Sequence, residues 1–277
     1  SHPASDLLHT LQHNMAISVL NYVEKSVPKN QKKFFRRILC AELTQTGVTT
    51  VPARPTGYSY IGWMARGSAT ATANGKGFDA DHGTVHYSGQ LTTFDAEYKL
   101  RGPAIHYLAE LHAHAAYDIL NRDIGALSNQ ILTLDTRLQD KPHLDHFTDI
   151  LQKLLPNNVS DSSPEIALAV RKIEAANGAI SIAGLANELG ISDRQLRRRF
   201  TCVVGLPPKS FAVCQRIISA LKLMVMNPDL SISDVVYQVG FADQSHLTNT
   251  FQQYLRTTPA KLELDSDGVL RSIVAQS

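Results

Sequence analysis

The sequence predicts an α+β protein with two domains: an N-terminal β-barrel or sandwich with flanking helices, and an all-α C-terminal domain with two helix-turn-helix motifs. Three observations predict this fold class. The length of 277 residues suits about two domains of ~100–200 residues each. Glycines punctuate residues 38–112, and one ten-residue pattern occurs twice near the end of the chain. Hydrophobic residues make up 43% and charged residues 19%, which excludes a disordered, collagen-like or coiled-coil chain.

A polar stretch with prolines near both ends, residues 155–164, divides the chain. It lacks apolar periodicity, which is typical of a linker. The sequence therefore predicts an N-terminal domain at 1–156, a linker at 157–164, a C-terminal domain at 165–265 and a tail at 266–277. No apolar run approaches the ~18 residues of a membrane span, so we expect no membrane partner. The lack of a signal-peptide pattern and the odd number of cysteines, three, favour a cytoplasmic protein with reduced thiols.

The N-terminal domain is expected to carry helices at both ends and strands between them. Residues 5–26 and 123–156 have apolar residues at helical spacing. From about residue 38 to 112, frequent glycines separate short apolar runs. Short runs with frequent turns are typical of an all-β barrel or sandwich.

The C-terminal domain contains one pattern twice, in residues 181–190 and 231–240. Each copy begins with serine, which can cap a helix, and ends with glycine, which permits the positive φ that ends one. A second helix follows each copy, and its leucine and phenylalanine face the core. These core residues are Leu196 and Phe200 in the first copy and Leu247 and Phe251 in the second. The repeat therefore predicts two helix-turn-helix motifs.

Charge is concentrated next to the first of these motifs. The whole chain has a net charge of only +2. Residues 171–222, however, hold nine basic and three acidic residues, a net charge of +6. A local excess of this kind is typical of a surface that binds phosphate, so the placement of charge favours a nucleic-acid partner although its total does not.

Residues 166–264 resemble the DNA-binding domain of AraC/XylS transcription regulators. The matching segments, in order, are 180–186, 189–200, 205–208 and 239–251. The resemblance implies seven helices, with two recognition helices that enter successive major grooves of double-stranded DNA. It also implies an N-terminal domain that binds a small effector, and a homodimer. Helices such as that expected at 123–156 pair subunits in this family; alternatively, they only cover the barrel.

The resemblance assigns DNA contacts to exposed positions of both recognition helices. These positions are Arg194, Arg197 and Arg198 in the first helix, and Gln244, Ser245, His246 and Asn249 in the second. Arginine can bind guanine with two hydrogen bonds, whereas glutamine and asparagine suit adenine. Asn249 stands where the family often carries arginine.

A second basic cluster lies in residues 29–37, which hold five cations and no acid. Lys32 with Arg36, and Lys33 with Arg37, are four residues apart, so a helix would bring each pair together. The cluster precedes the predicted barrel and is similar in this order to PilZ domains, which bind cyclic di-GMP. The resemblance and the cluster together predict an effector site at Lys32, Lys33, Arg36 and Arg37. Arg66, with Arg54 and Trp63, would complete it, because an arginine or an aromatic ring can stack on a purine. Two alternatives remain open: a neutral small molecule, or a solvated basic stripe with no ligand.

The sequence shows no nucleophile elbow, phosphate-loop motif or dinucleotide fingerprint, so we expect no catalytic residue and no enzyme. His112 and His114 would share one face of a strand, but no partner motif accompanies them, and we predict no metal site. His82, His86 and His106 would converge only in an unknown fold. The alternative function is a metal- or histidine-dependent barrel enzyme fused to a DNA-binding domain.

Overall fold

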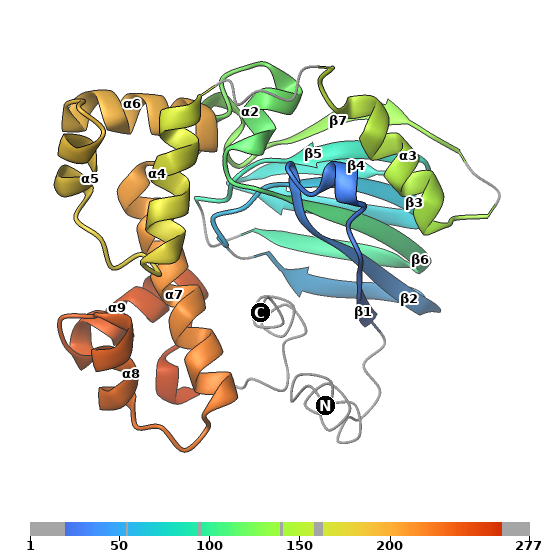
Figure 1. Cartoon of the computed structure of the whole chain (residues 1–277). Coiled ribbons are helices and arrows are strands. Elements are labelled where there is room, and N and C mark those ends of the chain that lie inside the picture. Colours follow the sequence, from blue (N-terminus) through green and yellow to red (C-terminus); the bar gives the residue numbers. More distant parts are fainter. Residues whose placement is uncertain (1–19, 54, 93–95, 139–140, 158–162, 262–277) are drawn as a thin grey trace.

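The computed structural model describes residues 20–53, 55–92, 96–138, 141–157 and 163–261 (Figure 1). A β-sheet domain and a helical domain lie side by side. The predicted fold class is thus confirmed. No helix among these residues is both long enough and apolar enough to cross a membrane.

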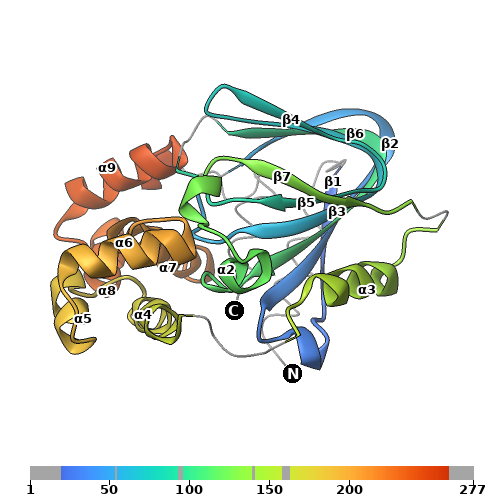
Figure 2. The ribbon, with the colours of Figure 1, turned by 90° about the horizontal axis from the view of Figure 1, so that it is seen from above.

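The N-terminal domain is built on one antiparallel sheet. Its strands run in the order β1-β2-β6-β3-β5-β7, and β4 pairs with β3. Their bounds are β1 Leu20–Lys25, β2 Phe35–Pro52, β3 Tyr60–Ala73, β4 Lys76–Ala80, β5 Thr84–Ser88, β6 Glu97–Leu111 and β7 Ile131–Thr136. Figure 2 shows the long strands bending, so that the sheet is strongly curved rather than flat.

The strands are longer than the glycine-separated runs predicted because several glycines lie within strands rather than between them. β3 continues through Gly67, next to a register shift against β6. Gly67 has a φ of +78°, and a Cβ there would lie 2.6 Å from the Cβ of Ala104. Only glycine accepts this conformation and this close approach. Glycines at such bulges bend strands, which accounts for the curvature of the sheet.

The two faces of the sheet have different partners, because alternate residues of a strand point to opposite sides. On one face, Trp63 and Tyr107 stack at 5.8 Å between ring centroids. Phe147 of α3 (Leu144–Leu154) stacks on both, at 6.4 and 5.6 Å. Helix α3 therefore covers this face with its apolar side, which supports the expectation that this helix covers the barrel. The other face lines a cavity.

Two predicted helices of this domain are wrong in part. Residues 20–25, the end of the helix expected at 5–26, form β1 and pair with β2; residues 1–19 lie outside the described residues. Within 123–156, only 144–154 is α-helical, whereas 131–136 forms β7 and pairs with β5. Strand pairing outweighed the local apolar spacing here. Leu138, which lies within the segment expected to be helical, is 67% exposed.

The C-terminal domain is helical, as predicted. Residues 163–261 contain six α-helices and a final 3₁₀-helix, where the resemblance implied seven helices. The bounds are α4 Pro164–Ala175, α5 Ile182–Glu188, α6 Asp193–Val204, α7 Pro208–Met226, α8 Ile232–Val239, α9 Gln244–Leu255 and η3 Pro259–Lys261.

Both predicted helix-turn-helix motifs form with the expected caps. The side chains of Ser181 and Ser231 accept hydrogen bonds from backbone N–H groups in the first turns of α5 and α8. Gly190 and Gly240 follow these helices with φ of +67° and +69°. Their positive φ is the conformation that the sequence pattern required. The buried pairs Leu196 with Phe200, and Leu247 with Phe251, then fix α6 and α9 in one core.

Candidate functional site

Helix α6 presents an arginine-rich face opposite its buried side. Leu196 and Phe200 are fully buried, whereas Arg194, Arg197 and Arg198 are exposed. Arg197 makes only a long 3.4 Å contact with Asp193, an exposed pair of small energetic value. All three predicted arginines are therefore placed together on one accessible helix face, free to reorient toward a ligand.

Helix α9 exposes its four predicted residues, Gln244, Ser245, His246 and Asn249, on the side away from the core. His246 differs from the others because its ring packs edge-on against Phe241 at 5.3 Å between centroids. Its Nδ1 also accepts from the backbone N–H of Ala242 at 3.5 Å. These contacts give His246 a part in the turn of its own motif.

The two exposed helices lie toward opposite ends of α7 (Figure 1). With 19 residues, α7 spans roughly 28 Å at ~1.5 Å per residue. Successive turns of the DNA major groove are ~34 Å apart. A helix of this length therefore suits two helices that reach adjacent turns of one duplex.

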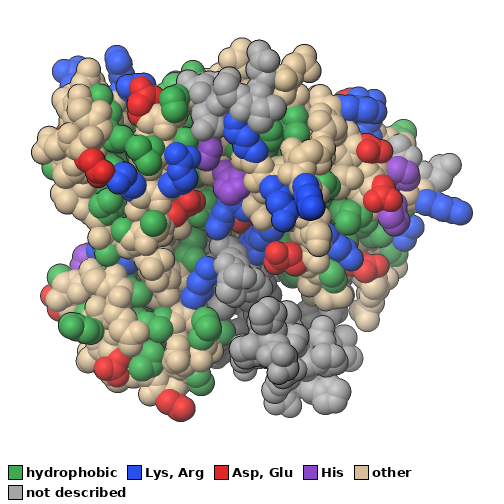
Figure 3. All heavy atoms as spheres, viewed as in Figure 1, with side chains coloured by type: hydrophobic (Ala, Val, Ile, Leu, Met, Phe, Trp, Pro, Cys, Tyr) green, Lys and Arg blue, Asp and Glu red, His purple; other side chains and the backbone are tan. Residues whose placement is uncertain are grey.

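The positive charge of this domain is strongly asymmetric. Four arginines stand in residues 194–199, whereas residues 223–255 contain no lysine or arginine. Figure 3 shows Lys and Arg side chains around α6 at the upper left and almost none over α8 and α9 at the lower left. The first motif therefore offers most of the charge that could meet phosphate groups.

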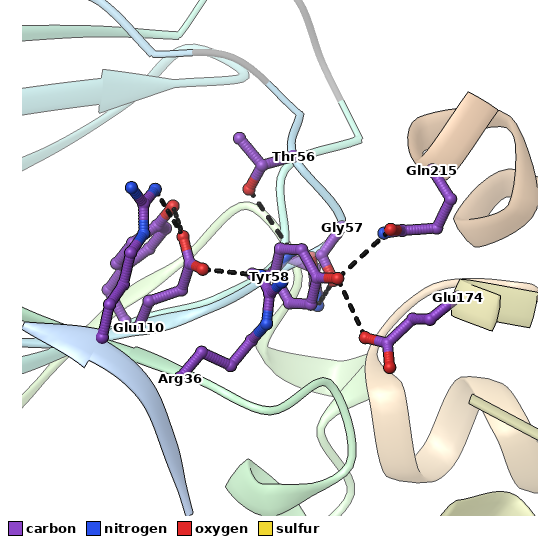
Figure 4. A network of polar contacts seen from close by, with 10 residues as sticks. Arg36, Thr56, Gly57, Tyr58, Glu110, Glu174 and Gln215 are labelled. Carbon is purple, nitrogen blue, oxygen red and sulfur yellow. Dashed lines mark hydrogen bonds and ion pairs between the residues drawn. The ribbon is translucent and has the colours of Figure 1, made fainter. Parts of the chain in front are cut away.

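A chain of buried polar contacts joins the sheet to the helical domain (Figure 4). Tyr58, 3% exposed, donates to Glu174 Oε1 of α4 at 2.8 Å and lies 3.2 Å from Gln215 Oε1 of α7. The guanidinium of Arg36 lies 3.7 Å from the centroid of the Tyr58 ring. Next to Tyr58, Gly57 packs on Phe211, where a Cβ would lie 3.1 Å from the ring. Tyr58 thus belongs to the sheet domain but packs within the helical core.

Glu110 anchors this chain inside the sheet. It is fully buried and accepts from Arg36 at 2.7 Å and from Arg37 at 3.0 Å. Tyr60 donates to the same carboxylate at 2.7 Å. Burial, together with the Arg36 and Arg37 cations, lowers the pKa of Lys222 on α7. Glu110 is therefore the acid that offsets the cations gathered where the two domains meet.

This arrangement corrects the helical spacing expected for the basic cluster. Arg36 and Arg37 lie in β2, and a bulge between Phe35 and Arg37 lets neighbouring side chains reach one carboxylate. Lys32 is exposed in the preceding turn, and Arg66 is exposed on β3. Helical pairing of Lys32 with Arg36, and of Lys33 with Arg37, is therefore wrong. Trp63 is in the core, and Arg54 lies outside the described residues.

A second contact joins the sheet domain to the C-terminal end of α6. The backbone N–H of Ile124 donates to Cys202 O at 2.8 Å, and Ser128 Oγ donates to Gly205 O at 2.6 Å. Gly205, with φ of +88°, packs on Gln90, whose amide donates to Gly57 O at 2.8 Å. The arginine-rich helix α6 is thus joined directly to the N-terminal domain.

The concave face of the sheet lines a mainly apolar, partly open cavity of about 320 Å³. Thr56, Tyr58 and Tyr60 form part of its wall, so the cavity and the polar chain to α4 and α7 share residues. Gly89, next to Gln90 in the chain, and Asn129, whose N–H donates to Gln90 O at 2.8 Å, also line it. Any change in this wall therefore bears on both domain contacts.

Two histidines lie in the cavity wall. The rings of His86 and His106 stack at 5.1 Å between centroids, and both side chains are 2% exposed. Burial lowers the pKa of His86 to about 4; burial and the neighbouring His86 lower that of His106 well below its usual value. Tyr98 O–H contacts His106 Nδ1 at 2.5 Å. Both imidazoles are therefore neutral near pH 7.

The other histidines do not join this pair. His82 is exposed in the turn before β5, and His112 and His114 stack on each other at 6.1 Å beyond the end of β6. Among the described residues, no group of three or more His, Cys, Asp or Glu side chains is arranged to hold a metal ion.

Sequence reasoning missed Tyr58, Glu110, Glu174 and Gln215. One signal was available for Glu110, a single acid in the apolar run 107–111 that ends a predicted strand. A buried carboxylate requires partners, and the cations upstream supply them. The convergence of Tyr58 with two helices more than 100 residues later left no local pattern.

Comparisons with known proteins agree with the geometry of the C-terminal domain. A helix-turn-helix domain family matches residues 185–263. The HTH-type transcriptional regulator ExsA of Pseudomonas aeruginosa is 27% identical over 86 residues, 31% of each chain. AlkA of Mycobacterium tuberculosis, a probable bifunctional transcriptional activator and DNA repair enzyme, is 29% identical over 130 residues, 43% of this chain and 26% of AlkA. The chain thus spans about a third or less of these relatives.

Among solved structures, apo ToxT from Vibrio cholerae strain SCE256 is similar to 81% of this chain and 95% of its own. The identity is 12% and the TM-score is 0.47.

The two buried histidines predict a loss of stability in weak acid. An unfolded chain protonates histidine near pH ~6.5, whereas folded His86 resists protonation to about pH 4. Between these values the unfolded state binds more protons, so the free energy of unfolding falls as pH falls. We expect urea titrations at pH 7, 6 and 5 to show this, and His86→Leu to flatten the slope. An unchanged slope in His86→Leu would show that His86 is protonated in the folded protein.

Replacement of Glu110 is predicted to destabilise the fold strongly. Glu110→Gln leaves Arg36 and Arg37 without their carboxylate, at a cost of roughly 3–5 kcal/mol in the free energy of unfolding. Glu97→Gln on the same strand is the matched control, since Glu97 pairs with Lys99 at the surface and its loss costs under ~1 kcal/mol. Equal losses in urea unfolding would contradict the role assigned to Glu110.

Proposed function

We propose that this chain, whose C-terminal part is an AraC-type helix-turn-helix domain, is a sequence-specific DNA-binding transcription regulator controlled by a small effector in its N-terminal domain. The observation that carries the proposal is the pair of helix-turn-helix motifs at 181–204 and 231–255, held in one core by α7. The domain match at 185–263 supports the same conclusion.

In this proposal, α6 supplies most of the affinity and the stricter base preference. Arg194, Arg197 and Arg198 offer forked donors suited to guanine edges or phosphates. Each cation that neutralises a phosphate also releases counterions, so binding weakens as salt rises. The second helix, with Gln244, Ser245 and Asn249 and no lysine or arginine, is proposed to read bases with little phosphate attraction.

The effector is proposed to act from the cavity in the sheet. Thr56, Tyr58 and Tyr60 line the cavity, and Tyr58 contacts both α4 and α7. A ligand that shifts this wall would change how the sheet domain holds the helical domain. It would alter DNA affinity only by the difference between its affinities for the DNA-competent and DNA-incompetent arrangements.

Three expectations from the sequence stay predictions. A homodimer is one, and its contact surface would lie elsewhere than the apolar side of α3, which packs on its own sheet. An effector site at the basic cluster is another. The geometry does not favour it, because Arg36 and Arg37 bind Glu110 and neither Lys32 nor Arg66 lines the cavity. Cyclic di-GMP as the effector is the third, and the only support for it was the basic cluster.

Binding-site selection from random DNA with the full chain tests the proposal, and Arg198→Ala refines it. We expect selection to yield one preferred sequence, and Arg198→Ala to weaken its binding by ~1–3 kcal/mol and relax one base pair. Arg137→Ala, which removes an exposed arginine of the sheet domain, is the control and should bind normally. No enrichment would refute a sequence-specific regulator, whereas wild-type binding by Arg198→Ala would refute only the orientation given to α6.

A further inference from the structure

We propose that the cavity takes an uncharged, largely apolar small molecule whose single hydrogen-bonding group docks on His86 and His106. The inference rests on the proposed function, because it names the chemical class of the effector. It is carried by the geometry of the histidine pair, by the scarcity of charge in the cavity wall, and by the space that Gly62 leaves.

The histidine pair supplies hydrogen-bonding atoms that the described protein leaves unused. His86 Nδ1 and His106 Nε2 are buried and have no hydrogen-bond partner among the described residues. Buried polar atoms are rarely left unpaired, because each lost hydrogen bond costs ~1–3 kcal/mol. A neutral imidazole offers one donor and one acceptor, so the pair matches a hydroxyl, carbonyl or amide group of a ligand.

The wall offers little to balance a charged ligand. Tyr58 and Tyr60, whose hydroxyls face the domain junction, already bind Glu174 and Glu110. Among the described lining residues, the charged ones are Lys76 and Glu97, and Glu97 pairs with Lys99. Lys76 is exposed at the start of β4. An ionised group beside the histidines would thus lose its hydration without gaining a buried counter-charge, which is costly.

Gly62 of β3 makes room for the pair. A Cβ at this position would lie 2.5 Å from His86 Nε2 and 2.7 Å from His106 Nε2. Its backbone lies in a regular strand, paired with His86 and Leu108. Glycine is therefore required here for lack of space and not for an unusual φ. Both imidazoles therefore rest on bare backbone, with apolar neighbours such as Leu39, Ala41 and Leu108 completing the wall.

The size of the cavity limits the ligand. About 320 Å³ is at the small end of the ~300–1,000 Å³ range of ligand pockets. Phe78 packs against His86 at 5.8 Å between ring centroids, and Tyr98 stacks on His106 at 5.5 Å. Aromatic rings that flank the pair favour a flat ligand of one or two rings.

A pair of probes that share a ring system but differ in charge tests this inference. Calorimetry on the full chain at pH 7 compares 2-naphthol, which is neutral, with 2-naphthoate, which is an anion. We expect 2-naphthol to bind at least about tenfold more tightly, because the carboxylate would be buried without a partner. Equal or tighter binding of 2-naphthoate, or no binding of either probe, would overturn the inference.

Variants locate the site. His106→Leu should weaken 2-naphthol binding about two- to tenfold, the value of one hydrogen bond. Tyr98→Phe, a milder change that frees His106 Nδ1, should act in the same direction and serves if His106→Leu does not fold. His82→Leu, which replaces an exposed histidine outside the cavity, is the matched control. Equal affinities in all these variants and the wild type would overturn docking on the histidine pair.

The two experiments distinguish a failure of the proposed function from a failure of this inference. Selection of a DNA sequence by the same preparation, with no preference for 2-naphthol, rejects the neutral ligand and keeps the regulator. A clear preference for 2-naphthol without sequence-selective DNA binding rejects the regulator and keeps the neutral site.

Discussion

The structure depends on one buried carboxylate, that of Glu110. Its partners Arg36 and Arg37 would otherwise place two cations beside Lys222 at the junction of the domains. Held by Glu110, Arg36 instead places its guanidinium over the Tyr58 ring, and the Tyr58 hydroxyl contacts Glu174 and Gln215 in the helical domain. A buried ion pair of this kind contributes little net stability compared with an apolar pair, but it fixes a geometry, since each partner alone would be a buried unpaired charge. The geometry fixed here is the docking of one domain on the other.

The two faces of the curved sheet have different roles. Its convex face is closed by α3 on Trp63 and Tyr107, as a purely structural core. Its concave face lines an apolar cavity with two neutral histidines. At Tyr58 the cavity wall meets α4 and α7, and beside Gln90 it meets the C-terminal end of α6. The cavity, the domain junction and helix α6 are therefore linked by direct contacts. The first motif, which bonds to the sheet domain at Cys202 and Gly205, is also the motif that carries the arginines.

How far the sequence predicted this arrangement depended on the range of the interactions. The helix-turn-helix repeat was predictable because caps, glycine turns and apolar spacing are local, and Ser181, Gly190 and Leu196 each occupy the expected place. The sheet was predictable as a class but not in detail, because Gly67 marks a bulge inside a strand and not a turn, and because residues 131–136 take their structure from β5. The basic cluster was interpreted as an anion site, and the ion pairs of Arg36 and Arg37 were missed, because their partner, Glu110, lies more than 70 residues away. The histidine pair required the pairing of β3 with both β5 and β6, which no local pattern encodes.

We propose that occupancy of the cavity and binding of DNA are coupled through Tyr58. The most direct test is the affinity for the selected DNA sequence, measured by fluorescence anisotropy with and without saturating 2-naphthol, in the wild type and in Tyr58→Phe. The phenylalanine keeps the ring under Arg36 and loses only the hydrogen bonds to the helical domain. We predict at least about a fivefold change of DNA affinity in the wild type, the lower end of usual coupling energies, and a much smaller change in Tyr58→Phe. An equal response in both proteins, or no response in the wild type, would contradict the coupling.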